Sequence, residues 1–326
     1  MVRKRIVWFL ISIVLCSAQI GRAYRTKLYP CTDDILPTEN IPVSPSCLDD
    51  LDADFKVVKL LGHGDAGGAV LVEDEKAQEF VAKYLKYGKT EAEVACAFLK
   101  GKRAAEAKLP VQTFRIYNPY DLFMQTYSWA RCDHVPEKWQ PKPGELGNSY
   151  SYQKFQAMMK NPGHEGFLIM FSNYAGEAIR NFVDLSPDDI KSVLFEIIFG
   201  LMELRNDFKF NHNDLAMGNN ILIRKDSPPR IYKISRDYYE VKSKYRPTFI
   251  DFGRSSIMKE VPSTDIPAIK NVFERLIKGK EGQFKELSEF MEGKVFQRAM
   301  LSSSSDGCSL RNILEEPYFD SLRRKE

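Results

Sequence analysis

Two short polar motifs, each next to a run of apolar residues, constrain the fold of this 326-residue chain more than any other feature. The first reads H-N-D-L-A-M-G-N over residues 212–219 and leads into the apolar residues 221–223. The second is D-F-G at 251–253, directly after the β-type residues 248–250. Because Asp214 and Asn219 are five residues apart, one loop can present a carboxylate and an amide to the same place. We therefore predict two strand-and-loop units, with Asp251 contributing a second carboxylate.

These residue types suit the transfer of a phosphoryl group. That reaction needs an aspartate to orient the acceptor hydroxyl and two further groups to hold the metal ions on the nucleotide phosphates. Asp214 suits the first role, and Asn219 and Asp251 suit the second. Taken together, the motifs resemble the catalytic loop and the metal-binding turn of the eukaryotic protein kinase superfamily. The resemblance implies ATP and Mg²⁺ as cofactors.

A glycine-rich segment earlier in the chain resembles the phosphate-binding turn of the same family. Glycine lets the backbone approach phosphate oxygens closely. The match is imperfect, because the valine falls one position late unless the turn carries an extra residue, and because Asp65 would repel phosphate. An ordinary glycine-rich hairpin is the alternative. The residues that the resemblance places at the nucleotide are Gly62, Gly64, Gly67, Gly68 and Val70.

The following stretch, F-V-A-K at 80–83, resembles the strand whose lysine pairs with the nucleotide phosphates. In the family, a glutamate on the next helix positions that lysine. Thr90 is a suitable N-cap for a helix that begins with Glu91 and Glu93, and Glu106 lies further along it. We expect Glu93 to be the partner of Lys83. The alternatives are an exposed lysine at a strand end and a solvated surface carboxylate.

The N-terminus has the composition of a secretory signal peptide. Basic residues at 3–5 precede the apolar run 6–16, which is too short for a spanning helix, and the small residues Gly21 and Ala23 suit cleavage. An uncleaved anchor is the alternative. Removing residues 1–23 lowers the Lys plus Arg count from 47 to 43 against 44 acids, so the formal charge changes from +3 to −1. We predict a secreted or lumenal protein of the secretory pathway, with no nucleic-acid partner and no stable membrane span after cleavage.

Five cysteines remain once Cys16 is removed with the signal peptide. Cys31 and Cys47 bracket a proline-rich, acidic stretch and could close a disulfide loop. Cys96 lies on an apolar helical stretch, so we expect a buried thiol there. The odd total, completed by Cys132 and Cys308, leaves at least one cysteine unpaired or bonded to another molecule.

The remaining chain is long enough for one two-lobed domain. We divide the sequence into the signal peptide 1–23, a proline-rich and acidic lead segment 24–51, and a kinase-like domain 52–326. The expected fold class is α+β, with a small β-rich N-lobe over about 52–171 and a larger helical C-lobe over about 175–326. In the connection between lobes, the resemblance makes Met170 the gatekeeper and turns the backbone from Phe171 to Tyr174 toward adenine.

Two insertions interrupt the pattern. The first, 129–166, carries Trp129 and Trp139, which could bind a partner or cover the edge of the core. The second, 224–246, is charged and rich in tyrosine, and we expect an exposed hairpin that contributes to substrate contacts. The segment between D-F-G and the helix that begins near Asp265 is very short and contains no A-P-E motif. The usual platform for a peptide substrate is therefore reduced or absent.

The helical lobe carries the remaining family features. Ser186 and the residues after it predict a helix N-terminus, with a cap and acidic residues in the first turn. By resemblance, His212 is a structural support beneath the catalytic loop, and Asp265 anchors that loop from below. Asn213 replaces the usual arginine of H-R-D, so the charge that pairs with a phosphorylated activation segment is missing.

Three functions remain open from the sequence. The first is a secreted protein kinase that transfers phosphate to a protein hydroxyl, and the residues 309–319, which resemble the closing segment of protein kinases, favour it. Whether the acceptor is Ser/Thr or Tyr stays undecided, because Ala216 stands where many serine/threonine kinases have a lysine and Gly218 where tyrosine kinases have an arginine. The second is a kinase of small hydroxyl compounds such as sugars, choline or aminoglycosides. The third is a non-catalytic pseudokinase scaffold.

Overall fold

A computed structural model describes most of the chain between residues 55 and 324. The described residues are 29–30, 55–64, 67–86, 89–108, 119–142, 153, 156–157, 159–160, 166–182, 184–225, 227–257, 264–301 and 308–324. The predicted signal peptide 1–23 lies outside the described residues, as do Cys31, Cys47 and Asp65. No helix within the described ranges is both long and apolar enough to cross a membrane.

The chain divides into two compact units, which confirms the expected α+β class. The first comprises Met1–Ala97 and Gln125–Tyr174 and is rich in strands, and the second comprises Phe98–Met124 and Ala175–Glu326 and is mainly helical. The predicted lobe boundary was therefore too simple, because 98–124 belongs with the helical unit. The physical reason is aromatic packing: the ring of Phe98 lies 5.1 Å from that of Phe210 and 5.2 Å from that of Phe252.

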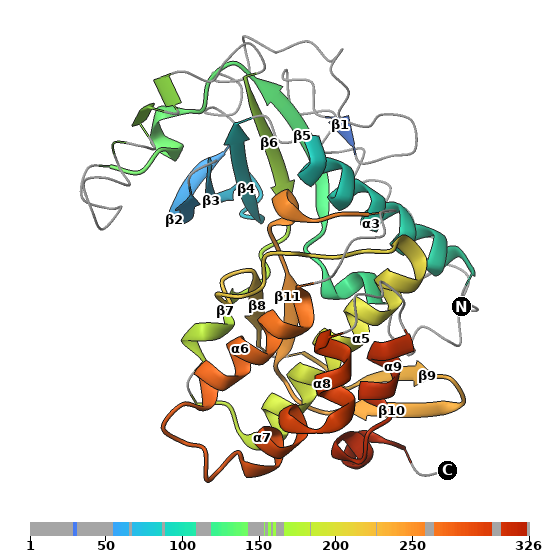
Figure 1. Cartoon of the computed structure of the whole chain (residues 1–326). Coiled ribbons are helices and arrows are strands. Elements are labelled where there is room, and N and C mark those ends of the chain that lie inside the picture. The colour runs from blue at the N-terminus through green and yellow to red at the C-terminus, as the bar shows by residue number, and fades with distance from the viewer. Residues whose placement is uncertain are drawn as a thin grey trace. The chain divides into compact units, whose positions relative to one another are not determined.

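The first unit is built on an antiparallel sheet, whose strands succeed one another in the upper part of Figure 1. The strand order is β1-β5-β6-β4-β3-β2. Consecutive residues are buried in several strands, all six of them in β6, so the sheet buries side chains on both faces. The strands are β1 (Tyr29–Pro30), β2 (Lys56–Gly64), β3 (Gly67–Glu73), β4 (Glu79–Lys86), β5 (Thr126–Cys132) and β6 (Phe167–Ser172).

One face of this sheet is covered by part of the first insertion. Trp139, at the end of the short 3₁₀ segment η3 (Glu137–Trp139), packs with Phe55 and Phe171 in an aromatic cluster. The hydroxyl of Tyr84 donates a hydrogen bond to the carbonyl of Trp139 at 3.1 Å. Trp139 and Trp129 are both 0% exposed. The alternative in which the tryptophans cover the core is confirmed, and the partner-binding alternative is wrong.

Helix α3 (Lys89–Lys108) follows β4 after two residues. It carries Cys96, which is fully buried and disulfide-bonded, as is Cys132 in β5. The expectation of a buried free thiol at Cys96 was therefore right about burial and wrong about pairing. An apolar helical surrounding predicts that a cysteine is buried, but it does not reveal whether a second sulfur lies within bonding distance.

The second unit is organised around helix α5 (Pro187–Phe208), whose buried residues include ten hydrophobic positions on consecutive turns. As predicted, Ser186 caps it: the Ser186 Oγ accepts a hydrogen bond from the Asp189 backbone N–H at 3.1 Å. A three-stranded sheet in the order β11-β8-β7 completes the unit. The other elements are η2 (Pro119–Leu122), β7 (Glu177–Ala178), η4 (Ile179–Asn181), β8 (Ile221–Arg224), β9 (Arg230–Ile234), β10 (Asp237–Val241), β11 (Arg246–Phe249), η5 (Phe252–Arg254), α6 (Asp265–Ile277), α7 (Lys285–Glu292), α8 (Lys294–Leu301), α9 (Cys308–Leu314) and η6 (Pro317–Leu322).

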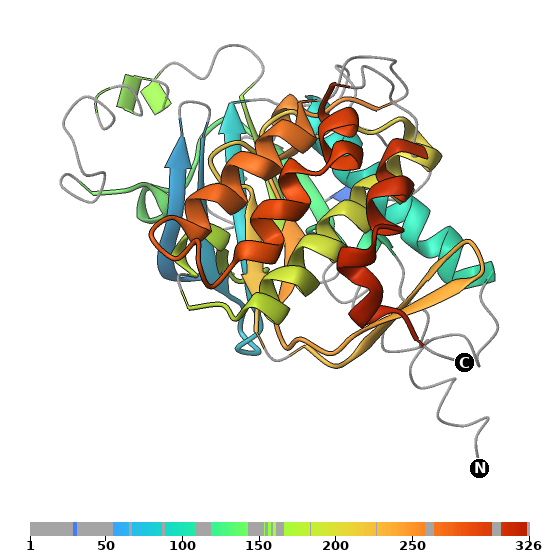
Figure 2. The same cartoon turned by 60° about the horizontal axis from the view of Figure 1, so that its bottom comes forward.

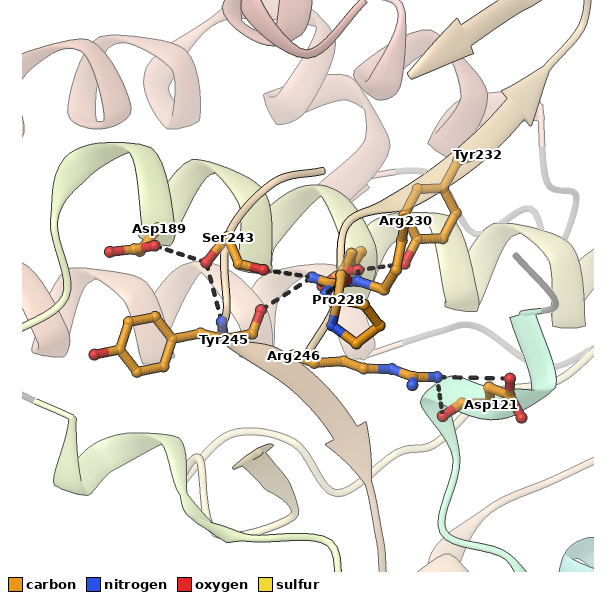
Figure 3. A network of polar contacts seen from close by, with 9 residues as sticks. Asp121, Asp189, Pro228, Arg230, Tyr232, Ser243, Tyr245 and Arg246 are labelled. Carbon is orange, nitrogen blue, oxygen red and sulfur yellow. Dashed lines mark hydrogen bonds and ion pairs between the residues drawn. The ribbon is translucent and has the colours of Figure 1, made fainter. Parts of the chain in front are cut away.

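The second insertion forms the hairpin β9–β10, which a buried ion pair fastens to α5. The Nε and Nη2 atoms of Arg230 both donate to the carboxylate of Glu196, which also accepts from the hydroxyl of Tyr232. Figure 3 shows how Arg230 also reaches the backbone carbonyls of Ser243 and Tyr245, at 3.1 and 3.2 Å. Burial raises the pKa of the Glu196 carboxyl above its usual value, while the charge of Arg230 opposes that shift.

The other strand of the hairpin is held as firmly. Tyr239 is fully buried and its hydroxyl accepts a hydrogen bond from Arg323 Nη2 at 3.1 Å, while the Arg324 N–H donates to the carbonyl of Tyr238 at 2.7 Å. Figure 2 shows the hairpin, in gold, beside the C-terminal residues in red. The expectation of a largely exposed hairpin was therefore wrong for one of its faces, because alternate residues pack into the core. Lys233, Tyr238 and Glu240 lie on the face that is not buried.

Candidate active site

Each unit carries its own set of the polar residues that the sequence singles out, and each set is built separately. In the first unit, Lys83 Nζ lies 2.5 Å from Glu91 Oε1, with the side chains 17% and 3% exposed. Glu91 is in the first turn of α3. The expected partner Glu93 is thereby corrected to Glu91. Two positions along a helix differ by about 200° in direction, so the choice between neighbouring glutamates depends on the helix phase, which residue spacing alone does not give.

Burial makes this pair more than a surface contact. An exposed Lys–Glu pair is worth little, since water and salt screen it. A carboxylate that is almost removed from water, like that of Glu91, instead needs a compensating cation. Lys83 supplies one, so the strand β4 and the helix α3 fix each other's position within the first unit.

The strand register decides which residues share the face of Lys83. Residues directly opposite in an antiparallel pair point to the same face. Lys83 is opposite Ala69 in β3 and Met170 in β6, so Met170 shares its face as the gatekeeper prediction requires. Val70, in contrast, is opposite Ala82 and is buried on the other face with the Trp139 cluster. The prediction that Val70 contacts nucleotide is therefore not supported by its position, because a shift of one residue along a strand reverses the face.

The glycines of β2 and β3 have different environments. A Cβ on Gly67 would lie 1.9 Å from the carbonyl oxygen of Tyr84, and one on Gly68 would lie 2.4 Å from the Tyr84 hydroxyl. Packing against β4 accounts for both of these glycines without a ligand. Gly62 is exposed and has no atom within 4 Å of a built Cβ, so it remains open to a phosphate. Gly64 is paired with Gly67 across the strands.

Part of the backbone that was expected to face adenine already makes hydrogen bonds within the first unit. The Asn173 N–H donates to the carbonyl of Gln125 at 3.1 Å, and Asn173 Oδ1 accepts from the Gln125 N–H at 2.8 Å. Phe171 lies within β6, between two strands. Tyr174 has the Lys59 ammonium 5.6 Å from the centre of its ring. The backbone N–H of Asn173 is therefore already satisfied and would have to exchange its partner to bind a base.

In the second unit, the catalytic loop rests on two fully buried residues, His212 and Asp265. The Asp265 carboxylate accepts hydrogen bonds from the backbone N–H groups of His212 and Asn213 at 2.9 and 2.8 Å. His212 Nε2 donates to the carbonyl of Ile250 at 2.9 Å, which ties the loop to the residue before D-F-G. Burial lowers the pKa of His212, so the imidazole is neutral at physiological pH. Both residues are supports, as predicted, and His212 is not placed as a general base.

Asp214 is oriented by Asn220, a residue that lies outside the H-N-D-L-A-M-G-N motif. Asn220 Nδ2 donates to the Asp214 carbonyl at 2.8 Å and to Asp214 Oδ2 at 3.1 Å. Asn219, which was predicted to bind metal, is exposed. Asn220 directly precedes β8, and its carbonyl accepts from the Ile250 N–H at 3.0 Å. The sequence signal that could have identified Asn220 is its position immediately before the strand, rather than its distance from Asp214.

Asp251 follows the neighbouring strand at the same end of the sheet. Phe249 of β11 is paired with Ile221 of β8, so Asn220 and Asp251 lie beyond the paired ends of their two strands. Asp251 has a left-handed backbone with φ of 64°, which lets the chain turn into η5. Three oxygen-bearing side chains, Asp214, Asn220 and Asp251, thus belong to one edge of this unit.

This set of donors fits a magnesium ion. Mg²⁺ prefers carboxylate, amide and water oxygens, and it is usually held by one or two protein carboxylates together with substrate phosphates. Asp251 and the amide of Asn220 would supply such oxygens. Within the described ranges, no group of three or more His, Cys, Asp or Glu side chains could hold a metal ion.

The comparisons with known proteins give a local likeness. No protein-family model matches the chain. Over 87 residues it is 38% identical to probable kinase 098L of Invertebrate iridescent virus 3, a stretch that covers 25% of the chain and 16% of the viral protein. The crystal structure of the PF14_0431 kinase domain superposes with a TM-score of 0.34 and 14% identity, covering 71% of this chain and 58% of that one. The viral likeness is confined to a quarter of this chain, and the superposition is too loose to carry an argument.

Proposed function

We propose that the chain is an ATP-dependent phosphotransferase, and specifically a protein kinase of the secretory pathway. The observation that carries the proposal is the hydrogen-bonded catalytic loop: Asp214 is oriented by Asn220, and the loop is anchored on Asp265. Such a preorganised carboxylate suits the orientation of an acceptor hydroxyl. The viral relative named a probable kinase supports the same reaction class.

Each residue has a defined role in this proposal. Asp214 accepts the proton of the acceptor hydroxyl as the phosphoryl group is transferred, and Lys83, positioned by Glu91, neutralises nucleotide phosphates. Asp251 and Asn220 would hold Mg²⁺, which would neutralise charge on the phosphates when bound. Asn219, the residue first expected as the metal ligand, would then be dispensable.

The secretory location has separate support. Cys96 and Cys132 are buried and disulfide-bonded, and such bonds persist in oxidising compartments. The N-terminal residues 1–23 have the composition of a signal peptide. A protein substrate is proposed on the resemblance of 309–319 to the closing segment of protein kinases.

A kinase of small hydroxyl compounds is the second candidate. It is favoured by the short stretch between η5, which ends at Arg254, and α6, which begins at Asp265. That stretch leaves little room for a peptide platform. A pseudokinase scaffold is the third candidate. It would keep the Lys83–Glu91 ion pair but would not transfer phosphate.

The test uses the mature chain, produced with its disulfides intact. Purified protein with ATP and Mg²⁺ should transfer phosphate to itself or to a generic protein, and Asp214→Asn should lower the rate by about 10²–10⁴-fold. Equal labelling by that variant would contradict the proposal. ADP release with a panel of small hydroxyl compounds and none with protein would favour the second candidate. Stabilisation by ATP and Mg²⁺ that is lost in Asp251→Ala, without turnover in either protein, would favour the scaffold.

A further inference from the structure

Arg254 lies beside the carboxylate of Asp214, in a position that neither the motifs nor the proposed mechanism uses. It is the last residue of η5, and its Nη1 is 3.6 Å from Asp214 Oδ1. The Arg254 side chain is 76% exposed and that of Asp214 is 37% exposed. A pair this long and this open to water contributes little stability. The contact therefore needs an explanation other than holding the fold together.

Asp214 does not depend on Arg254 for its orientation. Asn220 donates to both the carbonyl and the carboxylate of Asp214, at 2.8 and 3.1 Å. A guanidinium has five N–H donors in a rigid fork. In the part of the chain that the structure describes, Asp214 is the one group paired with the Arg254 guanidinium. Most of its donors thus remain available for a second anion.

The backbone of Arg254 is fixed, so only its side chain can swing. Asn213 Nδ2 donates to the Arg254 carbonyl at 3.3 Å. Two residues later, Ser256 and Asn211 exchange backbone hydrogen bonds of 2.9 and 3.0 Å. Between them Ser255 is buried, and its hydroxyl donates to the His212 carbonyl at 3.3 Å. These contacts attach the segment after D-F-G directly to the catalytic loop.

A second guanidinium reaches the same loop from α6. Arg275 Nη1 contacts the carbonyl of Ala216 at 3.3 Å and Met217 Sδ at 3.4 Å. Met217 is 59% exposed, so this part of the loop faces solvent. No carboxylate of the described residues is paired with Arg275. Two arginines thus contact the loop 214–217, and one of them adjoins the group that would meet the acceptor hydroxyl.

We propose that Arg254, assisted by Arg275, selects acceptors that carry a carboxylate or phosphate close to the hydroxyl. This inference rests on the proposed function. When the acceptor hydroxyl is hydrogen-bonded to the Asp214 carboxylate, the Arg254 guanidinium turns to the neighbouring anion and binds it through two parallel hydrogen bonds. Arg254 is then a specificity-determining residue. The anionic group comes from an acidic protein segment or from a phosphorylated small compound.

The experiment compares matched acceptors. Peptides with Ser, Thr or Tyr acceptors flanked by glutamates are set against the same peptides with glutamines, and a hexose phosphate is set against its parent hexose. The readout is the ratio of kcat/KM for the anionic over the neutral acceptor. For the wild type we expect a ratio of about ten or more. Arg254→Gln should reduce this ratio about tenfold, and Arg254→Lys and Arg275→Gln should reduce it by a smaller factor. Arg298→Gln, which changes an exposed arginine on α8, should leave the ratio unchanged.

The outcomes separate the two proposals. A wild-type ratio near one, or equal ratios in Arg254→Gln and Arg298→Gln, would overturn the role of Arg254 while leaving the phosphotransferase intact. A preference confined to the peptides identifies an acidic protein segment, and one confined to the hexose phosphate identifies a small compound. If no acceptor is phosphorylated, the proposed function fails, and anisotropy of the labelled glutamate peptide still tests Arg254. Binding about tenfold weaker in Arg254→Gln supports the inference, and equal binding overturns it.

Discussion

The catalytic loop of the second unit and the glycine-rich strands of the first show opposite relations between motif and structure. In the loop, several polar groups have specific partners: His212 with Ile250, Asp265 with two backbone N–H groups, and Asp214 with Asn220. In the strands, Gly67 and Gly68 are explained by the proximity of Tyr84 alone. A motif is therefore informative where its side chains hydrogen-bond to one another, and weak where its residues only provide space for a neighbour.

The largest effect is expected in the loop itself, where the two adjacent asparagines can be substituted one at a time. Asn220→Ala should lower kcat/KM by about a hundredfold, because Asp214 loses its orienting hydrogen bonds and the metal loses an oxygen ligand. Asn219→Ala is the matched control and should change the value less than about threefold, since that side chain is exposed. Titration of Mg²⁺ would show the loss as a higher metal requirement. The reverse order of the two variants would restore Asn219 as the ligand.

For the glycine-rich strands, the test measures the free energy of unfolding rather than activity. Gly68→Ala should lower the free energy of unfolding by about 1–3 kcal/mol, since the added Cβ would meet the Tyr84 hydroxyl at 2.4 Å. Gly62→Ala should change it by less than about 0.5 kcal/mol, because space is open there. Urea unfolding measures both. If Gly62→Ala instead raised the KM for ATP with stability unchanged, the open glycine would be the one that meets phosphate.

The smallest effect is expected for phosphorylation of the segment after D-F-G. Asn213 and Asn211 already bind this segment through the Arg254 carbonyl and through Ser256, so no phosphate is needed to order it. Phosphatase-treated enzyme should keep its turnover within about twofold. Mass spectrometry of the treated protein supplies the control for complete dephosphorylation. A tenfold loss, restored by phosphorylation at Ser256 or Thr264, would show that the loop needs an added charge after all.

Much of the helical unit could be predicted from sequence, because its signals are local. The cap at Ser186 and the buried stripe of α5 follow from side-chain types at helical spacing, and both are confirmed. The support role of His212 follows from the resemblance of residues 212–219 to the kinase catalytic loop. These features need a few neighbouring residues and no knowledge of distant contacts.

The misses share a different physical cause. Glu91 replaces Glu93, and Val70 faces away from Lys83, because one or two positions change the face of a helix or strand completely. Asn220, which the motif did not single out, contacts Asp214 because the strand pairing, not the count from Asp214, fixes its place. The buried face of the β9–β10 hairpin depends on Glu196, which lies far away in the sequence. Charge and tyrosine content could not reveal that partner.

The disulfide-bonded state of Cys96 determines how the protein should be handled at the bench. This cysteine lies on α3, the helix that holds Glu91 next to Lys83, and it is fully buried. Kinase assays customarily contain thiol reductants, and thiolates exchange with disulfides whenever they gain access. Protein made in a reducing cytosol, or stored with dithiothreitol, could therefore give a false negative in every activity test above. Expression in an oxidising compartment and thiol-free buffers are the conditions under which inactivity would carry meaning.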